Sequence, residues 1–205
     1  MAEIADVLKI PGAIPEIIIG GLTDNVKTEA DGTIVMSGAA TTFCDSCVPV
    51  ESMRQAVAPT WATISGSVGA YTFAVLDSVE GSVKVPTETK ALSDATVLLT
   101  VLTNGLEATD AFMAWELEYS VIGSVPGATV TLATGDVAIA ANTPDKTKVT
   151  ITLGTITGVS MGDIISFQLR RVTAVGVAPV ANPFTLDVNV RTESDTFGSR
   201  TVTTK

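Results

Sequence analysis

The sequence contains no histidine, and only 17% of its 205 residues are charged. Histidine is the commonest general base and the commonest metal ligand near neutral pH. Its absence argues against most hydrolase and metalloenzyme mechanisms. We therefore expect a protein that is not an enzyme and that carries no cofactor.

Basic residues are also scarce, since 12 Lys and Arg stand against 22 Asp and Glu, which gives a formal charge of −10. A nucleic-acid binder neutralises phosphates with Lys and Arg, so a chain this acidic is not expected to bind nucleic acid. No apolar run is long enough to span a membrane, and Glu3 stands where a secretory signal would carry a basic residue. We expect no membrane partner and synthesis in the cytoplasm.

The chain has two cysteines, Cys44 and Cys47, in a single Cys-x-x-Cys. A structural zinc site needs four ligands, so one chain cannot complete it without histidine, although a site shared between subunits stays open. A thioredoxin-type redox motif needs a βαβ context that this neighbourhood lacks. The motif is predicted to be a loop pair, either free or locally bridged.

Valine and threonine are abundant, and 17 Gly and 9 Pro are scattered along the chain as turn signals. A chain of this length can bury a complete core without metal or disulfide. The mean hydropathy of +0.42 is high for a monomer. Together these features favour one β-rich domain with part of its surface buried against partners.

Residues 112–122 show an alternating strand pattern, and we expect the other strands of the domain to pack around this segment. Met113, Trp115, Leu117, Tyr119 and Val121 fall on one face of an extended strand, and polar residues fall on the other. The same alternation recurs in three later segments, and no helix pattern separates consecutive strands. The predicted core residues are Trp115, Leu117, Tyr119, Val149, Ile151, Phe167, Leu169, Phe184, Leu186 and Val188.

These strands predict an all-β fold, an antiparallel β-sandwich of jelly-roll-like type with an extended N-terminal arm. An immunoglobulin-like sandwich ranks second because its Cys…Trp…Cys framework is missing. In the first half, the pattern also predicts a short helix within residues 50–58, a strand over residues 60–64 and a turn at Glu80-Gly81.

Residues 1–30 differ from the domain predicted over residues 31–205, which ends in a short polar tail. Apolar residues stand first at helical spacing and then in an extended run framed by Pro15 and Gly20. Such an arm either packs on its own domain or reaches a neighbouring subunit or a larger assembly. The predicted assembly residues are Ile4, Val7, Leu8, Ile14, Ile17, Ile18, Ile19 and Leu22.

Three further groups of polar residues have the residue types that chemistry or ligand binding requires. Glu116 and Glu118 lie two residues apart, roughly 6.5 to 7 Å along a strand, but they project side by side and favour a solvated face over a glycosidase pair. Asp24, Asp31 and Asp45 lie in predicted loops and could supply oxygen ligands to calcium between subunits. Arg171 points inward by parity, so it either lies past the edge of the core or pairs with a buried acid.

Over about residues 30–197 the chain resembles the small jelly-roll virion proteins of tailed bacteriophages, of the capsid decoration or head-fibre type. The motifs that carry the resemblance lie in residues 114–120, 142–146, 162–171 and 184–190. The resemblance implies a non-enzymatic virion component that forms a homo-oligomer such as a trimer. It also implies binding to the major capsid protein or other virion proteins, and a place on the virion surface after assembly in the host cytoplasm.

Three functions follow as hypotheses. The first is a capsid decoration or cement protein that binds the shell through its apolar arm. The second is a self-assembling filament subunit in which the arm completes the sheet of the next copy by donor-strand exchange. The third is an adhesin or carbohydrate-binding module, which is weakened by an aromatic content of 5% and by the expected burial of Trp115 and Tyr119.

Overall fold

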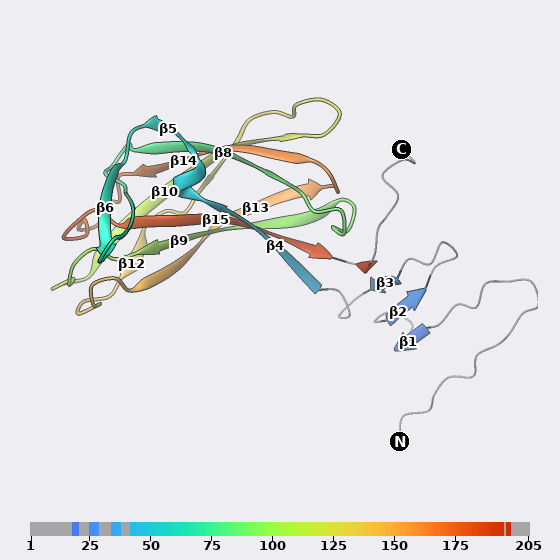
Figure 1. The fold of residues 1–205 in the computed structure, drawn as a ribbon, viewed down its shortest axis with the longest axis horizontal. Helices are drawn as coiled ribbons and strands as arrows, with labels where there is room; N and C mark the ends of the chain where they lie inside the picture. The colour runs from blue at the N-terminus through green and yellow to red at the C-terminus, as the bar shows by residue number, and fades with distance from the viewer. Residues whose placement is uncertain (1–17, 21–24, 29–33, 38–41, 195, 198–205) are drawn as a thin grey trace, which may run out of the picture.

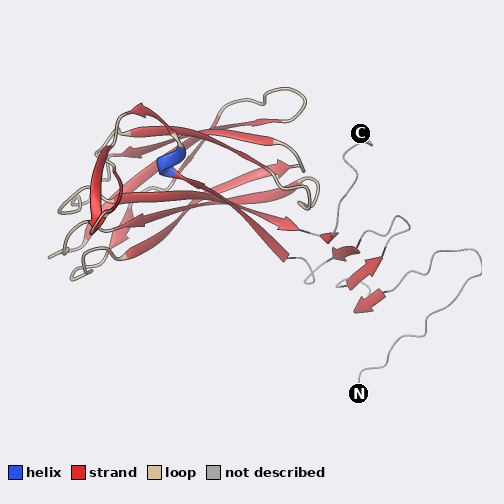
Figure 2. Ribbon diagram, viewed as in Figure 1, coloured by secondary structure: helices blue, strands red, loops and turns tan. Residues whose placement is uncertain are grey.

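The computed structural model describes residues 18–20, 25–28, 34–37, 42–194 and 196–197. Within these residues the regular structure is almost entirely β, and the one helix, η2 (Val50–Ser52), is a 3-10 turn. Two six-stranded antiparallel sheets pack face to face, and a smaller sheet lies beyond one end (Figures 1 and 2). The fold is the antiparallel, jelly-roll-like β-sandwich that the sequence predicts.

Sheet I contains, in spatial order, β11 (Val130–Ala133), β10 (Ala111–Ile122), β14 (Ile164–Val172), β8 (Ser78–Lys84) and β5 (Arg54–Val57), with β12 (Val137–Ile139) also paired to β10. Sheet II contains β13 (Lys148–Val159), β9 (Ser93–Leu102), β15 (Phe184–Ser194), β7 (Val68–Thr72) and β6 (Thr60–Ser65), with β4 (Thr42–Pro49) also paired to β15. The terminal sheet contains β1 (Ile18–Gly20), β2 (Asn25–Thr28), β3 (Ile34–Ser37) and β16 (Thr196–Phe197).

The core lies between sheets I and II and confirms most of the alternation predicted for residues 112–122, although Ala114 on the predicted solvent face is buried and Val121 is half-buried. Trp115 is fully buried, and its ring lies 5.5 Å from that of Phe73 between ring centroids. Leu117, Tyr119 and Met113 are buried on the same face of β10. Of the other predicted core residues, those that the structure buries are Ile151, Phe167, Leu169, Phe184 and Val188.

Two predicted core residues lie outside the fully buried set. Leu186 is half-buried because the pairing of β15 with β9 shifts register between Thr185 and Asp187, and such a bulge breaks strict alternation. The same shift buries Thr185, which the alternation had placed in solvent. Val149 is half-buried near the start of β13, although it packs against the core.

Two predictions in the first half are wrong. The helix predicted within residues 50–58 is replaced by the short turn η2 and by β5, because β5 pairs with β8 at the edge of sheet I. The turn predicted at Glu80-Gly81 is the middle of β8, which pairs along its whole length with β14. In both places cross-strand pairing overrides the local signal. The strand predicted over residues 60–64 is confirmed as β6.

The predicted arm is described only in part. Ile4, Val7, Leu8, Ile14, Ile17 and Leu22 lie outside the described residues. Ile18 and Ile19 belong to β1, which pairs with β2 of the same chain, while β3 pairs with both β2 and β16. The division into an arm at residues 1–30 and a domain at residues 31–205 stays a prediction, as does attachment through the arm.

Candidate functional site

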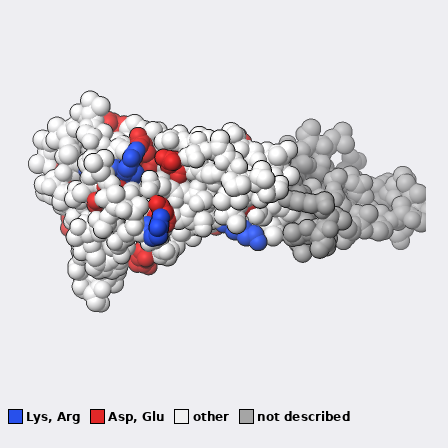
Figure 3. Space-filling view, turned by 90° about the horizontal axis from the view of Figure 1, so that it is seen from above, with Lys and Arg blue, Asp and Glu red and all other residues white. Residues whose placement is uncertain are grey.

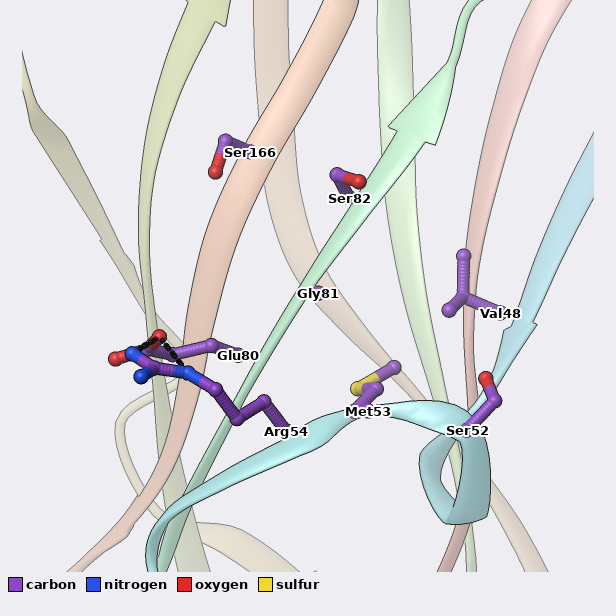
Figure 4. A pocket seen from close by; sticks show the side chains of 8 residues that line it. All are labelled: Val48, Ser52, Met53, Arg54, Glu80, Gly81, Ser82 and Ser166. Carbon is purple, nitrogen blue, oxygen red and sulfur yellow. Dashed lines mark hydrogen bonds and ion pairs between the residues drawn. The ribbon is translucent and has the colours of Figure 1, made fainter.

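A cleft of about 400 Å³ opens beside the segment of the chain that runs from η2 to β5 (Figure 4). Its walls come from β8 and β14 of sheet I and from β4 of sheet II, and the chain from η2 to β5 crosses it. The lining residues are Val48, Ser52, Met53, Arg54, Glu80, Gly81, Ser82 and Ser166.

Local sequence explains why the cleft forms here. Pro49 ends β4 and stands before η2, whose turn sends the chain across from sheet II to sheet I. Gly81 then interrupts β8 with a position that has no side chain. A Cβ atom at Gly81 would lie 3.0 Å from the Cζ atom of Phe167 and 3.2 Å from the Cγ atom of Met53. A side chain at this position would therefore collide with Phe167 and Met53, and glycine lets β8 pack tightly against both beside the cleft.

Polar groups of both charges line this cleft. Arg54 donates from Nε to the Glu80 carboxylate at 2.9 Å and also from Nη2, and Gln168 donates to Glu80 at 3.4 Å. Ser82 and Ser166 are paired across β8 and β14, and their hydroxyl groups have no hydrogen-bond partner among the described residues. The cleft thus offers a guanidinium, a carboxylate and two unengaged hydroxyl groups, which can donate to and accept from a hydroxyl-rich ligand.

Trp61 is an exposed aromatic residue that sequence reasoning missed, since only Trp115 and Tyr119 were considered as platforms. The Trp61 side chain is 52% exposed on β6, an edge strand of sheet II. Its indole lies directly against Gly69, where a Cβ atom would lie 2.7 Å from Nε1, and it meets the Tyr71 ring edge-on. The signal was present in the sequence, since Pro59 directly precedes this strand and proline favours sheet edges.

Glu116 and Glu118, the two neighbouring carboxylates of β10, lie on the outer face of sheet I, outside the cleft. Glu116 accepts from Arg170 at 2.5 Å, and Glu118 stands opposite Gln168 in the neighbouring strand. Glu118 is exposed. This placement confirms the solvated face that the alternation predicts.

Arg171 is buried, with 3% of its surface exposed, at the edge of the core, which is one of the two environments predicted for it. Its Nη1 group donates to the Phe73 carbonyl at 2.5 Å and to the Asn182 amide oxygen at 2.8 Å, without a carboxylate. Burial lowers the pKa of this guanidinium from its ordinary value, and the nearby Asp77 carboxylate opposes the shift. The side chain joins two loops at one end of the sandwich, so its role is structural.

Cys44 and Cys47 lie in β4, so the prediction of a loop is wrong, and both are unbridged, which is one of the two states predicted for them. Residues three apart on a strand point to opposite faces, which separates the two thiols. Burial, followed by the negative charge of Glu88, raises the pKa of Cys44, and burial followed by Asp187 raises the pKa of Cys47. Both remain thiols at neutral pH. Within the described residues no group of three or more potential ligands could hold a metal ion.

Asp45, considered above as a calcium ligand in a loop, also lies in β4. Arg191 of β15 donates to its carboxylate from Nε at 2.7 Å and from Nη2 at 2.8 Å. Hydrogen bonding from Arg191 lowers the pKa of Asp45 below the usual 3.8. Its carboxylate is engaged in joining β4 to sheet II. Asp24 and Asp31 lie outside the described residues.

We expect Asp45→Asn to lower the free energy of unfolding by about 0.5 kcal/mol at neutral pH, since both partners are partly exposed. The folded pKa of Asp45 lies below 3.8, so the contribution is complete above that pH and disappears as the pH falls through the folded value. Urea unfolding between neutral and acidic pH measures the difference. Asp94→Asn, at an exposed carboxylate of β9 with no partner among the described residues, is the control. Equal effects of the two substitutions would contradict the assignment.

No helix among the described residues has the length and hydropathy needed to cross a membrane. Neither a protein-family model nor a curated protein matches the sequence.

Solved structures with related folds do match. A CBM36-1 domain of a multidomain xylanase from the hindgut metagenome of Trinervitermes trinervoides is 11% identical, with 77% of this chain and 100% of that chain covered and a TM-score of 0.39. The exo-β-1,3-galactanase of Phanerochaete chrysosporium is 14% identical over 83% of this chain and 33% of that chain, with a TM-score of 0.41.

The infectious bursal disease virus Gx strain structure is 11% identical over 84% of this chain and 42% of that chain, with a TM-score of 0.36. Such low identities and scores concern the fold type, so the ligands and partners of these proteins are not carried over to this chain.

Proposed function

We propose that this chain is a non-catalytic binding module whose ligand is a carbohydrate, held in the cleft between β8 and β4. The observation that carries the proposal is the pair of unengaged hydroxyl groups of Ser82 and Ser166 beside the Arg54–Glu80 pair. Sugar hydroxyl groups are both donors and acceptors, and such a mixed set of polar groups on a rigid sheet matches them.

The size and lining of the cleft support this ligand class. About 400 Å³ lies within the range of small-molecule sites and would accommodate one or two sugar rings. Val48, which is half-buried, supplies apolar surface for the C–H face of a ring, and the buried Met53 forms part of the cleft wall, although neither is aromatic. The proposal therefore rests on the chemistry of this cleft.

The absence of an enzymatic role is part of the same proposal. Glu80 is held by Arg54 and Gln168, and no second carboxylate lines the cleft to act as its acid or base partner. A fixed carboxylate of this kind orients a ligand by accepting hydrogen bonds. Turnover of any oligosaccharide that the protein binds would overturn this part of the proposal.

Filling the cleft tests the proposed binding. We expect at least one oligosaccharide on a glycan array to bind the native chain, and Ser82→Trp to weaken that binding by about tenfold or more, because Ser82 lines the cleft and the indole would fill it. Titration calorimetry with the same oligosaccharide measures the loss.

The matched control is Thr152→Trp, which places the same side chain at an exposed position of β13. It should bind as the native chain does. Absence of binding to every glycan, or equal binding by the two variants, would contradict the proposed site.

A second candidate is a structural role on a virion, and the terminal sheet favours it. This sheet joins strands from both ends of the chain and lies beyond one end of the sandwich (Figure 1). In this role the terminal sheet would attach the module to the capsid shell, and the cleft would face away from the shell. Electron micrographs of the purified chain distinguish a capsid decoration protein from a filament subunit. Rods that grow without capsids support the filament hypothesis, and compact small oligomers count against it.

A further inference from the structure

Three loops lie at the end of the sandwich opposite the terminal sheet (Figure 1), and they carry a set of exposed apolar side chains. Val175 is 97% exposed, and the other five members are between 40% and 66% exposed. We call this cluster the apolar tip. Its residues are Val75, Leu76, Leu106, Val175, Val177 and Val180. In Figure 3 this end of the molecule is mostly free of charged atoms.

The longest loop of the tip, residues 173–183, is held with its polar backbone inward. The Asp136 carboxylate accepts from the N–H groups of Val175 and Gly176 at 3.0 to 3.1 Å. The buried Glu107 carboxylate accepts from the N–H of Val180 at 3.1 Å. Because these carboxylates bind the backbone from below, the valine side chains between them are directed to solvent. The loop is thus fixed in a conformation that exposes its apolar residues.

A second loop shows the same feature. Leu76 has a positive φ of 78° and is 60% exposed, a combination that costs conformational energy and leaves apolar surface in water. Its N–H donates to the Arg171 carbonyl at 2.8 Å, and the Arg171 side chain donates to Asn182 in the longest loop. The two loops are therefore joined in one rigid unit, and burial of Leu76 against a partner would recover part of this cost.

The size of the tip indicates what can cover it. Six side chains with these exposures present roughly 600 Å² of apolar surface, the upper end of the largest patches on typical monomers. Two such patches facing each other would bury roughly 1,200 Å², the lower limit of a standard specific interface. In a two-fold symmetric dimer both copies contribute the same surface patch, so the apolar tip of one copy can cover the apolar tip of the other.

Electrostatics at the tip allow two identical copies to approach. The chain as a whole carries −10, which would repel a second copy at most places on its surface. At the tip, Glu107 and Asp136 accept from backbone N–H groups, and Asp145 is paired with Lys146 at 2.9 Å. The terminal sheet lies at the far end, where it does not obstruct a second tip (Figure 1).

We propose that the apolar tip is a self-association surface through which two copies of this chain form a tip-to-tip dimer. The association is weak, with dissociation constants in the micromolar to millimolar range, because the buried area is small. Added salt strengthens it, since screening reduces the repulsion between two acidic copies while apolar contacts persist.

Analytical ultracentrifugation of the full chain over a range of concentrations tests this proposal. We expect a monomer–dimer equilibrium in the native chain and a weakening of about tenfold or more in Val175→Glu, which places one charge from each copy at the centre of the contact. Val125→Glu, at an exposed valine of a loop at the opposite end, is the matched control and should dimerise as the native chain does.

Urea unfolding should give the same midpoint for both variants, since each side chain lies in solvent in the monomer. A monomer at every concentration and salt would overturn the proposal. So would a dimer that survives Val175→Glu or that Val125→Glu disrupts, because the contact would then lie elsewhere. If Val175→Glu fails to fold, Val177→Glu at a neighbouring exposed position repeats the test.

Discussion

Trp115→Ala is expected to lower the free energy of unfolding by about 3 to 5 kcal/mol, a large part of the roughly 5 to 15 kcal/mol that stabilises a typical domain. The Trp115 side chain is fully buried between the two sheets, where it packs beside Phe73. Alanine leaves a cavity that the paired strands around it cannot collapse to fill, since their spacing is fixed by backbone hydrogen bonds. Urea unfolding followed by circular dichroism measures the loss.

Two controls accompany this substitution. Trp115→Phe keeps an aromatic ring and removes an indole N–H that has no hydrogen-bond partner among the described residues, so it should cost less than half as much. Glu116→Gln combined with Glu118→Gln changes the solvent side of the same strand and should stay within about 1 kcal/mol. If the double change unfolds the protein and Trp115→Ala does not, β10 faces the other way.

Glu107→Ala is expected to cost about 1 to 3 kcal/mol, because it leaves the N–H of Val180 without its acceptor in a partly buried place. The backbone carbonyl of Glu107 also accepts from the N–H of Asn142. Glu107 therefore connects its own loop to the loop that contains Asn142 and, through its side chain, to the longest tip loop. Hydrogen exchange at the Val180 amide should accelerate more than exchange at core amides, since the change releases one end of the longest tip loop.

Glu107→Gln keeps an oxygen that can accept from Val180 and should retain most of the stability and most of the protection at that amide. The comparison separates the hydrogen bond from the charge. If Val180 exchanges equally in the native chain and in Glu107→Ala, the carboxylate does not hold the loop, and the rigid apolar tip loses its main support.

The predicted core residues show where the period-two alternation of a strand predicts burial correctly and where it does not. It placed Trp115 and Leu169 correctly because a strand between two regular neighbours keeps a strict period of two. It failed at Leu186, where a bulge shifts the register by one residue. A bulge depends on how the neighbouring strand is paired, and that information lies outside the segment itself.

The candidate site was largely missed for a related reason. Ser82 and Ser166 are 84 positions apart in the sequence and form a pair only because β8 lies beside β14. The local sequence predicts a turn at Gly81, but in the structure Gly81 lies within β8, where its missing side chain lets the strand pack against Phe167 and Met53. The apolar loop at residues 173–183 was visible in the sequence as an uncharged run, but its exposure depends on Glu107 and Asp136 from other loops.

Local periodicity and composition were enough to establish the fold class and the inward face of the central strand, whereas the expectation that an acidic chain without histidine is not an enzyme stays a prediction. These properties require no knowledge of what lies opposite a given segment. The tertiary structure was needed to establish where strands meet, and therefore that Cys44 and Cys47 point to opposite faces, that Arg54 and Glu80 border a cleft, and that six apolar side chains gather at one end. Each of these features depends on contacts between residues distant in the chain, and such contacts are set by strand order and register.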